Sequence, residues 1–393
     1  MAIKLSQRVQ RIKPSPTLAV TARAAEMRAA GHDVIGLGAG EPDFDTPAAI
    51  KEAAKAAIDK GASKYAPVPG TPGLKAAVVE KFKRDNGLDY EPDQVLVSVG
   101  GKQSFYNLFQ ALLDDGDEVV IAAPYWVSYP AMVQLAGGEP VIVEAGIDAD
   151  FKITPEQLEA ALTDKTRCVV LNSPSNPTGK AYTKAELAAL GEVLVKRPDV
   201  LVATDDMYEH ILWTDEGFCN IVNATPALYD QTIVMNGVSK AYAMTGWRIG
   251  YAAGPKDLIK AMSKIQSQST SGATTVSQMA AEAALTGDQQ CVADMVKEFK
   301  KRHDFVVAAL NDLPGVRCLP SDGTFYSFPD FSEAIARLDG VDDDVALSEY
   351  LIEKAGVALV PGSAFGAPGY ARLSYATSME NLEKALERIA GAL

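Results

Sequence analysis

The chain has 393 residues, 47% of them hydrophobic and 22% charged, and a formal net charge of −14. Such acidity repels a phosphate backbone, which argues against a nucleic-acid partner. The sequence has no apolar run of about 18 residues and no apolar segment behind its N-terminal basic residues, so we expect no membrane span, no signal peptide and a cytoplasmic location. The length favours two domains, or one large domain with a smaller satellite.

Cysteine and histidine spacing gives no sign of a metal centre or of a disulfide framework. The four cysteines lie far apart and form no Cys-x-x-Cys pair: Cys168, Cys219, Cys291 and Cys318. The three histidines share no ligand spacing. Because structural metal sites and disulfide scaffolds need clustered ligands, we expect neither, and we expect no metal in catalysis.

The first 45 or so residues contain one helical pattern followed by a Gly/Pro loop. From residue 95 onward, short apolar, β-branched runs alternate with helical patterns. The predicted strands are Val95–Val99, Val119–Ala122, Val141–Val143, Cys168–Leu171, Val200–Ala203, Thr232–Met235 and Ile249–Ala252. Helical spacing covers Gln103–Leu113, Pro155–Leu162 and Lys184–Val195. This alternation is typical of an α/β domain with a mostly parallel, helix-flanked sheet.

The region after about residue 290 changes character to a long charged helix, a strand pair and a final helix. We interpret the two ends of the chain as one smaller α+β domain. The predicted division is an N-terminal segment, residues 1–47, that belongs to the small domain, a large domain of residues 48–290, and the rest of the small domain in residues 291–393.

The stretch from Gly237 to Gly250 places Lys240 in a nearly uncharged run, with Arg248 eight residues further on. Desolvation disfavours an ammonium group, which leaves a nucleophilic amine able to form a Schiff base with an aldehyde such as pyridoxal phosphate. Arg248 could then grip the phosphate bidentately, and Ser239 could add a hydroxyl donor. The alternative is a lysine and an arginine in a surface loop.

Other candidate residues follow the predicted strands, where ligands bind in open α/β sheets. Gly101, Lys102 and Gln103 open a helix after the strand at 95–99, which suits an anion, although a tight connection looks the same. Asn176 stands in a proline-containing loop after the strand at 168–171, and its amide could donate to a phenolate oxygen. The alternative for Asn176 is a simple turn.

A carboxylate and a phenol, Asp205 and Tyr208, emerge together after the strand at 200–203. A pair of acids after a strand is commonly a solvated turn or a helix cap. The neighbouring candidates favour a functional role instead.

The order of these strands, helices and candidate residues along the chain resembles that of the fold type I pyridoxal-phosphate enzymes, specifically the class I aminotransferases and their bacterial aspartate aminotransferase branch. The likeness covers essentially the whole chain, from Arg11–Thr17 through Gly38–Pro47 and Gly237–Gly250 to Arg372–Thr377. The resemblance implies transfer of the amino group of L-aspartate to 2-oxoglutarate, giving oxaloacetate and L-glutamate by ping-pong kinetics. It also implies prephenate as a second substrate, which would give arogenate.

The resemblance assigns roles around the cofactor. It implies that Lys240 carries the cofactor and shuttles the substrate proton, that Asp205 pairs with the pyridine nitrogen, and that Asn176 and Tyr208 bind the phenolic oxygen. Trp126, which the sequence alone would place in the core, would stack on the ring and face the substrate. The implied phosphate-binding residues are Gly101, Lys102, Gln103, Ser239 and Arg248.

The resemblance also assigns the substrate α-carboxylate to Arg372, with help from the backbone of Gly40. Without the rest of the pattern, Arg372 would be interpreted as a rim salt bridge. Tyr65 resembles the tyrosine that reaches the phosphate of the neighbouring subunit. A homodimer with shared active sites is therefore implied.

One departure concerns the distal carboxylate of the substrate. In the better-studied aspartate aminotransferases an arginine of the neighbouring subunit binds it, but the matching region here, Gln266–Thr275, contains no arginine. Lys102, with Ser15, Thr17 and a Ser or Thr of that loop, resembles the arrangement of the other bacterial subgroup. A lysine is a flexible point charge, so it tolerates more than one distal acid.

Other fold type I enzymes would use the same lysine and aspartate: a broad-specificity aminotransferase, a β-lyase, a decarboxylase or a cyclopropane-forming synthase. Arg372 and Lys102 together favour a dicarboxylic substrate. A non-catalytic pyridoxal-binding regulator is the alternative of a different class. We expect no DNA-binding module of that kind, because the residues nearest the N-terminus already resemble the aminotransferase pattern.

Overall fold

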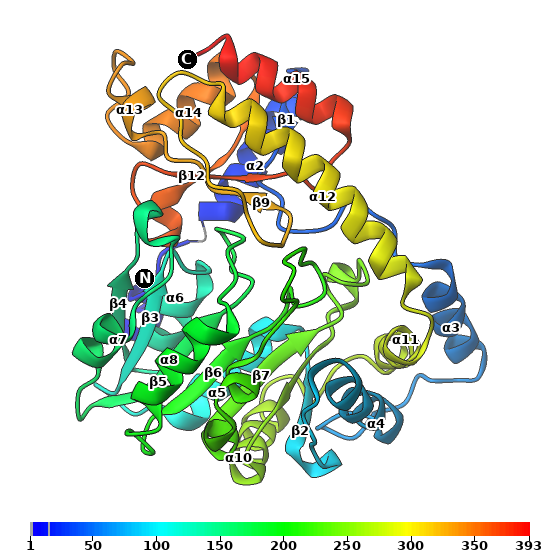
Figure 1. Ribbon diagram of the computed structural model, residues 1–393. Coiled ribbons are helices and arrows are strands. Elements are labelled where there is room, and N and C mark those ends of the chain that lie inside the picture. The colour runs from blue at the N-terminus through cyan, green and yellow to red at the C-terminus, as the bar shows by residue number, and fades with distance from the viewer. Residues whose placement is uncertain (1–2, 15) are drawn as a thin grey trace.

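The computed structural model describes residues 3–14 and 16–393 (Figure 1). Its helices are α1 (Gln7–Gln10), α2 (Pro16–Ala29), α3 (Ala48–Asp59), α4 (Pro72–Lys81), α5 (Gly101–Leu112), α6 (Ser128–Leu135), α7 (Pro155–Ala161), α8 (Lys184–Leu194), α9 (Ile221–Ala224), α10 (Lys256–Ser267), α11 (Thr275–Thr286), α12 (Gln290–Asn311), α13 (Ser332–Ile335), α14 (Asp344–Lys354) and α15 (Met379–Ala390). Its strands are β1 (Ile35–Gly36), β2 (Val95–Ser98), β3 (Glu118–Ala123), β4 (Glu139–Glu144), β5 (Thr166–Asn172), β6 (Leu201–Asp205), β7 (Thr232–Gly237), β8 (Gly250–Ala253), β9 (Tyr326–Ser327), β10 (Val357–Ala358), β11 (Val360–Pro361) and β12 (Ala371–Ser374).

A seven-stranded sheet in the order β2-β8-β7-β6-β5-β3-β4 forms the centre of the larger part. β8 runs antiparallel to both of its neighbours, β2 and β7, and the remaining pairs are parallel. Each predicted strand and each predicted helix of this part is present, with ends within two residues of the prediction. The predicted fold class, a mostly parallel and helix-flanked sheet, is confirmed.

Both faces of this sheet are covered, which explains why its strands are apolar runs rather than alternating patterns. In β2, Leu96 packs on the face covered by α5, α6 and α10, whereas Val95 and Val97 pack on the face covered by α4, α7, α8 and α11. All three side chains are fully buried. Polar residues can therefore reach a ligand at the ends of the strands, beyond the covered faces of the sheet.

The smaller part contains two small sheets. β1 pairs in parallel with β10, and β11, β12 and β9 form an antiparallel sheet. The prediction of a single strand pair after residue 290 was wrong, because this region contains four strands, β9 to β12. Of these, β9, β10 and β11 have only two residues each and are too short to show an alternating pattern. In Figure 1, α12 runs from beside α3 and α11 up to α15, and so links the two parts.

From α2 onward, the N-terminal segment packs against the C-terminal region, whereas α1 contacts α6 of the larger part. Ala24 and Val34 share a buried cluster with Ile352 and Ala358. Backbone hydrogen bonds also join Leu37 to Ala358, since the Leu37 N–H donates to that carbonyl at 2.9 Å. The domain boundaries at 47/48 and 290/291 stay a prediction.

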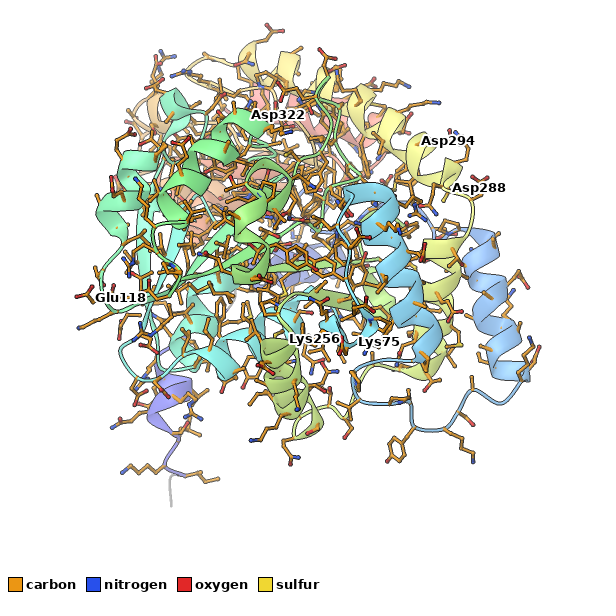
Figure 2. All side chains as sticks on the ribbon, turned by 60° about the horizontal axis from the view of Figure 1, so that its bottom comes forward. Lys75, Glu118, Lys256, Asp288, Asp294 and Asp322 are labelled. Carbon is orange, nitrogen blue, oxygen red and sulfur yellow. The ribbon has the colours of Figure 1, made fainter. Side chains whose placement is uncertain are left out.

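Figure 2 shows Asp288 and Asp294 on the outer edge of the molecule, where α11 is followed by α12. Both side chains are exposed, as expected for carboxylates without a buried partner. Among the described residues, no helix combines the length and the apolar character needed to cross a bilayer.

Candidate active site

A cavity of about 460 Å³ lies beyond the carboxyl ends of β5, β6 and β7, between the large sheet and the smaller part. Strand ends of an open α/β sheet are the usual place for a ligand. The cavity brings together the following predicted residues: Thr17, Gly40, Gly101, Lys102, Trp126, Asn176, Asp205, Tyr208, Ser239, Lys240, Arg248 and Arg372.

Three of these residues lie on one loop between neighbouring strands. Gly237, at the end of β7, is paired with Gly250, at the start of β8, so the loop between them begins and ends at the same end of the sheet. This loop therefore holds Ser239, Lys240 and Arg248 at the carboxyl end of β7. Gly250 is required by close packing, because a Cβ there would lie 2.3 Å from the backbone nitrogen of Gly101.

Lys240 points from this loop toward the smaller part, and its Nζ donates to the carbonyl oxygen of Gly40 at 2.5 Å. Burial is the main cause that lowers the pKa of Lys240, and the positive charge of Arg372 adds to it; the pKa falls from 10.5 to about 8. This agrees with the desolvation expected from the sequence, and it makes a neutral, nucleophilic amine accessible near physiological pH.

The start of α5 and the guanidinium of Arg248 form a cationic corner. Gly100 has a left-handed backbone (φ 80°), and a Cβ on it would lie 2.6 Å from Nη2 of Arg248, so the arginine packs directly on the glycine. Arg248 donates to the carbonyl of Thr245 at 2.9 Å, and none of the described carboxylates lies within ion-pair distance of it. An unpaired guanidinium beside a helix N-terminus suits an anion such as phosphate.

Asp205, the last residue of β6, presents a buried carboxylate to the cavity. Its Oδ2 accepts a hydrogen bond from the hydroxyl of Tyr129 at 2.5 Å, and its Oδ1 accepts one from the backbone N–H of Met207 at 3.3 Å. Burial raises the pKa of Asp205 to about 6. A cation in the cavity would stabilise the ionised form of Asp205.

Arg372, on β12, reaches the opposite side of the cavity with only 3% of its surface exposed. Its Nη1 donates to Oδ1 of Asn176 at 2.8 Å, its Nη2 donates to the carbonyl of Gly38 at 2.9 Å, and its Nε has no partner within the described residues. The guanidinium lies 4.3 Å from the ring centroid of Tyr326. No described carboxylate pairs with this buried charge, which rules out a rim salt bridge and favours an anionic ligand.

Aromatic and basic side chains complete the walls. The hydroxyls of Tyr208 and Tyr326 share a hydrogen bond of 2.9 Å. Nζ of Lys102 lies 5.1 Å from the ring centroid of Trp126, within cation–π range. Burial lowers the pKa of Lys102, and Arg248 lowers it further. Thr17, in the first turn of α2, faces the same space.

Two of the predicted residues that the structure describes, Gln103 and Tyr65, do not line this cavity. Gln103 accepts a hydrogen bond from the N–H of Val99 at 2.7 Å and donates to the hydroxyl of Thr270 at 2.8 Å, so its side chain braces the start of α5 from outside. Tyr65 is 99% exposed on the loop between α3 and α4, beside residues 270–275. Ser15 lies outside the described residues.

The structure adds residues that sequence reasoning missed. Each of them forms a hydrogen bond with a predicted residue. The hydroxyl of Tyr129 donates to the carboxylate of Asp205, the side chain of Asn172 donates to the backbone carbonyl of Asp205 at 2.9 Å, and the hydroxyl of Tyr326 bonds to that of Tyr208. Tyr129 stands three residues after Trp126, and its N–H donates to the Trp126 carbonyl at 3.1 Å in the turn that leads into α6. That spacing was the available signal.

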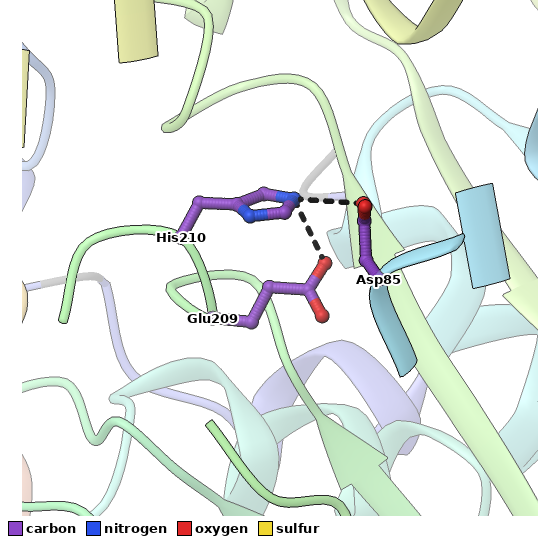
Figure 3. A group of neighbouring side chains, drawn as sticks. All are labelled: Asp85, Glu209 and His210. Atoms are coloured by element: carbon purple, nitrogen blue, oxygen red, sulfur yellow. Dashed lines mark ion pairs between the residues drawn. The ribbon is translucent and has the colours of Figure 1, made fainter. Parts of the chain in front are cut away.

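A separate cluster follows the segment that carries Asp205 and Tyr208: Glu209 is buried in it, His210 is half-buried and Asp85 is exposed. Nε2 of His210 lies 3.4 Å from Asp85 and 3.3 Å from Glu209, and dashed lines in Figure 3 mark these two ion pairs. These three residues have metal-ligand chemistry, but the fully buried ammonium of Lys81 forms an ion pair with Glu209 and lies 4.0 Å from Asp85. Lys81 thus already supplies the countercharge, and we interpret the cluster as a salt-bridge network.

Glu209 depends on Lys81 for its charge. Burial alone would raise the pKa of Glu209, but the charges of Lys81 and His210 outweigh it and lower the pKa below its usual value. The change Lys81→Met leaves this buried carboxylate without its cation, so we expect a loss of about 3–5 kcal/mol in the free energy of unfolding. Denaturant titration measures this loss.

The matched control is Lys83→Met, in which an ammonium 3.8 Å from Asp89 and 67% exposed is removed. A surface pair of this kind contributes about 0–1 kcal/mol. Equal losses in the two variants would contradict a stabilising role for the Lys81 network.

A family profile, related sequences and solved structures all place this chain among the aminotransferases. The profile of the aminotransferase class I and II family matches residues 32–389. An aspartate/prephenate aminotransferase of Nitrosomonas europaea is 58% identical over all of both chains, and an aspartate aminotransferase of Geobacillus stearothermophilus is 53% identical over 98% of each. A crystal structure of the aspartate aminotransferase of Rhizobium meliloti superposes with a TM-score of 0.96 at 47% identity, covering 100% of this chain and 99% of the other. The chain therefore belongs to the class I and II aminotransferases.

Proposed function

We propose that this enzyme is a pyridoxal-phosphate-dependent aspartate aminotransferase, which transfers the amino group of L-aspartate to 2-oxoglutarate. The observation that carries the proposal is the pair of cationic side chains, Arg372 and Lys102, that face one cavity with Lys240 and have no carboxylate partner among the described residues. Two such charges suit a substrate with two carboxylates. The names of the relatives support it, and so does an aspartate aminotransferase structure from Thermus thermophilus with maleate, a dicarboxylate (TM-score 0.93, 47% identity, 100% of both chains).

The residues of the cavity fit pyridoxal phosphate. Arg248, without a carboxylate partner, would hold the phosphate together with Ser239 and the start of α5. The buried carboxylate of Asp205 would pair with the ring nitrogen, and Trp126 would cover the ring. Tyr208 and Asn176 would contact its phenolic oxygen. When bound, this cofactor supplies an electron sink for the charge that develops at the substrate α-carbon.

Other side chains would bind the substrate, transfer its proton and exclude water. Arg372 binds the α-carboxylate by two parallel hydrogen bonds and so orients the α-hydrogen. Lys240, with its lowered pKa, would accept the proton from the α-carbon at Nζ and deliver it to the cofactor, and in the second half-reaction it would carry a proton from the cofactor to the α-carbon of the keto acid. Thr17 on α2 belongs to the smaller part, so movement of that part over the substrate would exclude water.

Prephenate is a second candidate substrate. Lys102 is a point charge on a flexible stem, with Trp126 beside it, so a distal carboxylate can be held at more than one position. The relative from Nitrosomonas europaea is named for both substrates.

We also propose a homodimer that shares its active sites. The support is Tyr65, whose side chain is 99% exposed next to the loop of residues 270–275 and away from the cavity of its own chain. A fully exposed tyrosine is typical of a side chain that a second copy covers.

The variant Lys102→Met tests the distal half of the proposal. It keeps the stem and removes the charge, so kcat/KM for L-aspartate is expected to fall about 10–100-fold, the loss of one charge-assisted hydrogen bond. L-alanine has no distal carboxylate, and its kcat/KM is expected to stay within about twofold. The measurement is the rate of keto-acid formation from each donor, with Lys260→Met, which changes an exposed lysine, as the control. Equal losses for both donors would show that Lys102 does not select the distal acid.

A further inference from the structure

The carboxylate of Asp205 is held by two groups only within the described residues. One is the backbone N–H of Met207, at 3.3 Å from Oδ1; the other is the hydroxyl of Tyr129, at 2.5 Å from Oδ2. Tyr129 is 1% exposed and Asp205 is 9% exposed. The shorter contact, to a side chain that lies 76 positions away in the chain, is therefore the stronger restraint on this carboxylate.

The ring of Tyr129 is fixed by the elements that build the cofactor cavity. It lies 5.0 Å from the ring centroid of Phe105 on α5 and 5.2 Å from that of Trp126, against which it packs edge-on at 84°. α5 also carries Gly101 and Lys102 at its start. The hydroxyl of Tyr129 is thus placed relative to the cavity walls, and it fixes the carboxylate of Asp205 relative to the same walls.

The direction of the hydrogen bond follows from the two pKa values. Burial, and secondarily the charge of Asp205, raises the pKa of Tyr129 well above its usual value, so the phenol keeps its proton and donates. Burial raises the pKa of Asp205 to about 6, and the bond from Tyr129 acts against this rise. Loss of the donor would bring the carboxyl closer to protonation at neutral pH.

We propose that Tyr129 is the positioning residue for Asp205: its hydroxyl keeps the carboxylate ionised and aimed into the cavity, and thereby sets how strongly Asp205 pairs with the ring nitrogen of pyridoxal phosphate. This rests on the function proposed above. Tyr129 itself does not line the cavity, so it acts through Asp205.

The test is Tyr129→Phe, which keeps the ring contacts and removes the hydroxyl. In the cofactor-free protein, the pKa of Asp205, followed by carbon NMR and assigned with Asp205→Asn, is expected to rise by about one to two units. The affinity for pyridoxal phosphate is expected to fall about 10–100-fold, and the acid limb of the kcat profile is expected to move to higher pH. The matched control is Tyr125→Phe, since Tyr125 is half-buried in the segment just before α6 and makes no described hydrogen bond to Asp205.

The outcomes separate the two proposals. An Asp205 pKa unchanged in Tyr129→Phe overturns the role of Tyr129, whereas failure of the unmodified protein to bind pyridoxal phosphate overturns the proposed function. A measurement on the unmodified protein does not depend on folding of the variant: the hydroxyl proton of Tyr129 is expected as a strongly deshielded proton NMR signal that disappears in Asp205→Asn. Persistence of that signal in Asp205→Asn also overturns the proposal.

Discussion

Replacement of Lys240 by alanine is expected to lower kcat by at least about 10⁴-fold, the upper end of what a positioned proton-transfer group contributes. The described groups on the cavity wall are poor substitutes: Lys102 and Arg248 are cations, Asp205 is held by Tyr129 and Met207, and the carboxylate of Glu41 accepts a hydrogen bond from the hydroxyl of Thr245 at 2.8 Å. The fold is expected to survive, because the described hydrogen bond of Nζ is one contact to the carbonyl of Gly40. Far-UV circular dichroism and the melting temperature check the fold, and single-turnover mixing with L-aspartate checks the chemistry.

The pH dependence of cofactor attachment is a second measurement of the role of Lys240. A lysine whose pKa lies at about 8 rather than 10.5 has on the order of 10²-fold more neutral amine near pH 7.5 than an exposed lysine. Only the neutral form is a nucleophile, so the rate at which pyridoxal phosphate attaches to the cofactor-free protein is expected to rise with pH and level off above about 8. Lys260→Ala, at an exposed position, should leave this profile unchanged. Turnover by Lys240→Ala within tenfold of the unmodified rate would remove Lys240 from the mechanism.

The central sheet could be predicted from the sequence because its strands, except the edge strand β4, are buried on both faces and therefore form continuous apolar runs between turn residues. It also located most of the cavity, since Asn176, Asp205 and Lys240 each follow such a strand, and parallel strands bring their carboxyl ends together. Local pattern and topology are sufficient for that inference. The roles of these residues came from the family resemblance.

The remaining features depend on contacts between distant segments. Tyr129 and Asp205 are 76 positions apart, and Lys81 meets Glu209 across more than a hundred, so no spacing rule indicates either pair. His210 showed no ligand spacing in the sequence because its acidic neighbour Asp85 comes from the π-helical turn after α4. The position of the Gln103 side chain could not be predicted for a related reason: its partner, Thr270, lies on a distant loop.

The variant Arg372→Met is expected to lower kcat/KM for L-aspartate by at least about 10²-fold. Two charge-assisted hydrogen bonds to the α-carboxylate contribute about 1.5–3 kcal/mol each, and every 1.36 kcal/mol corresponds to a factor of ten. The free enzyme is expected to lose no more than about 1–3 kcal/mol of stability: methionine fits against Tyr326 and Phe365 and removes a buried charge, but the acceptors on Asn176 and Gly38 lose their donor. Since the α-carboxylate is bound before and during the reaction, KM should rise at least as much as kcat falls.

Comparison of amino-group donors distinguishes this variant from Lys102→Met. L-Alanine carries an α-carboxylate but no distal one, so Arg372→Met should impair L-alanine and L-aspartate alike, whereas Lys102→Met should impair L-aspartate alone. Arg317→Met, at a side chain that is 55% exposed and paired with Asp148, is the matched control and should change neither donor. If Arg372→Met lowered kcat/KM less than tenfold for both donors, another group would hold the α-carboxylate. If instead Arg372→Met impaired L-aspartate alone and Lys102→Met impaired both donors, the two cationic side chains would hold the opposite ends of the substrate from those assigned here.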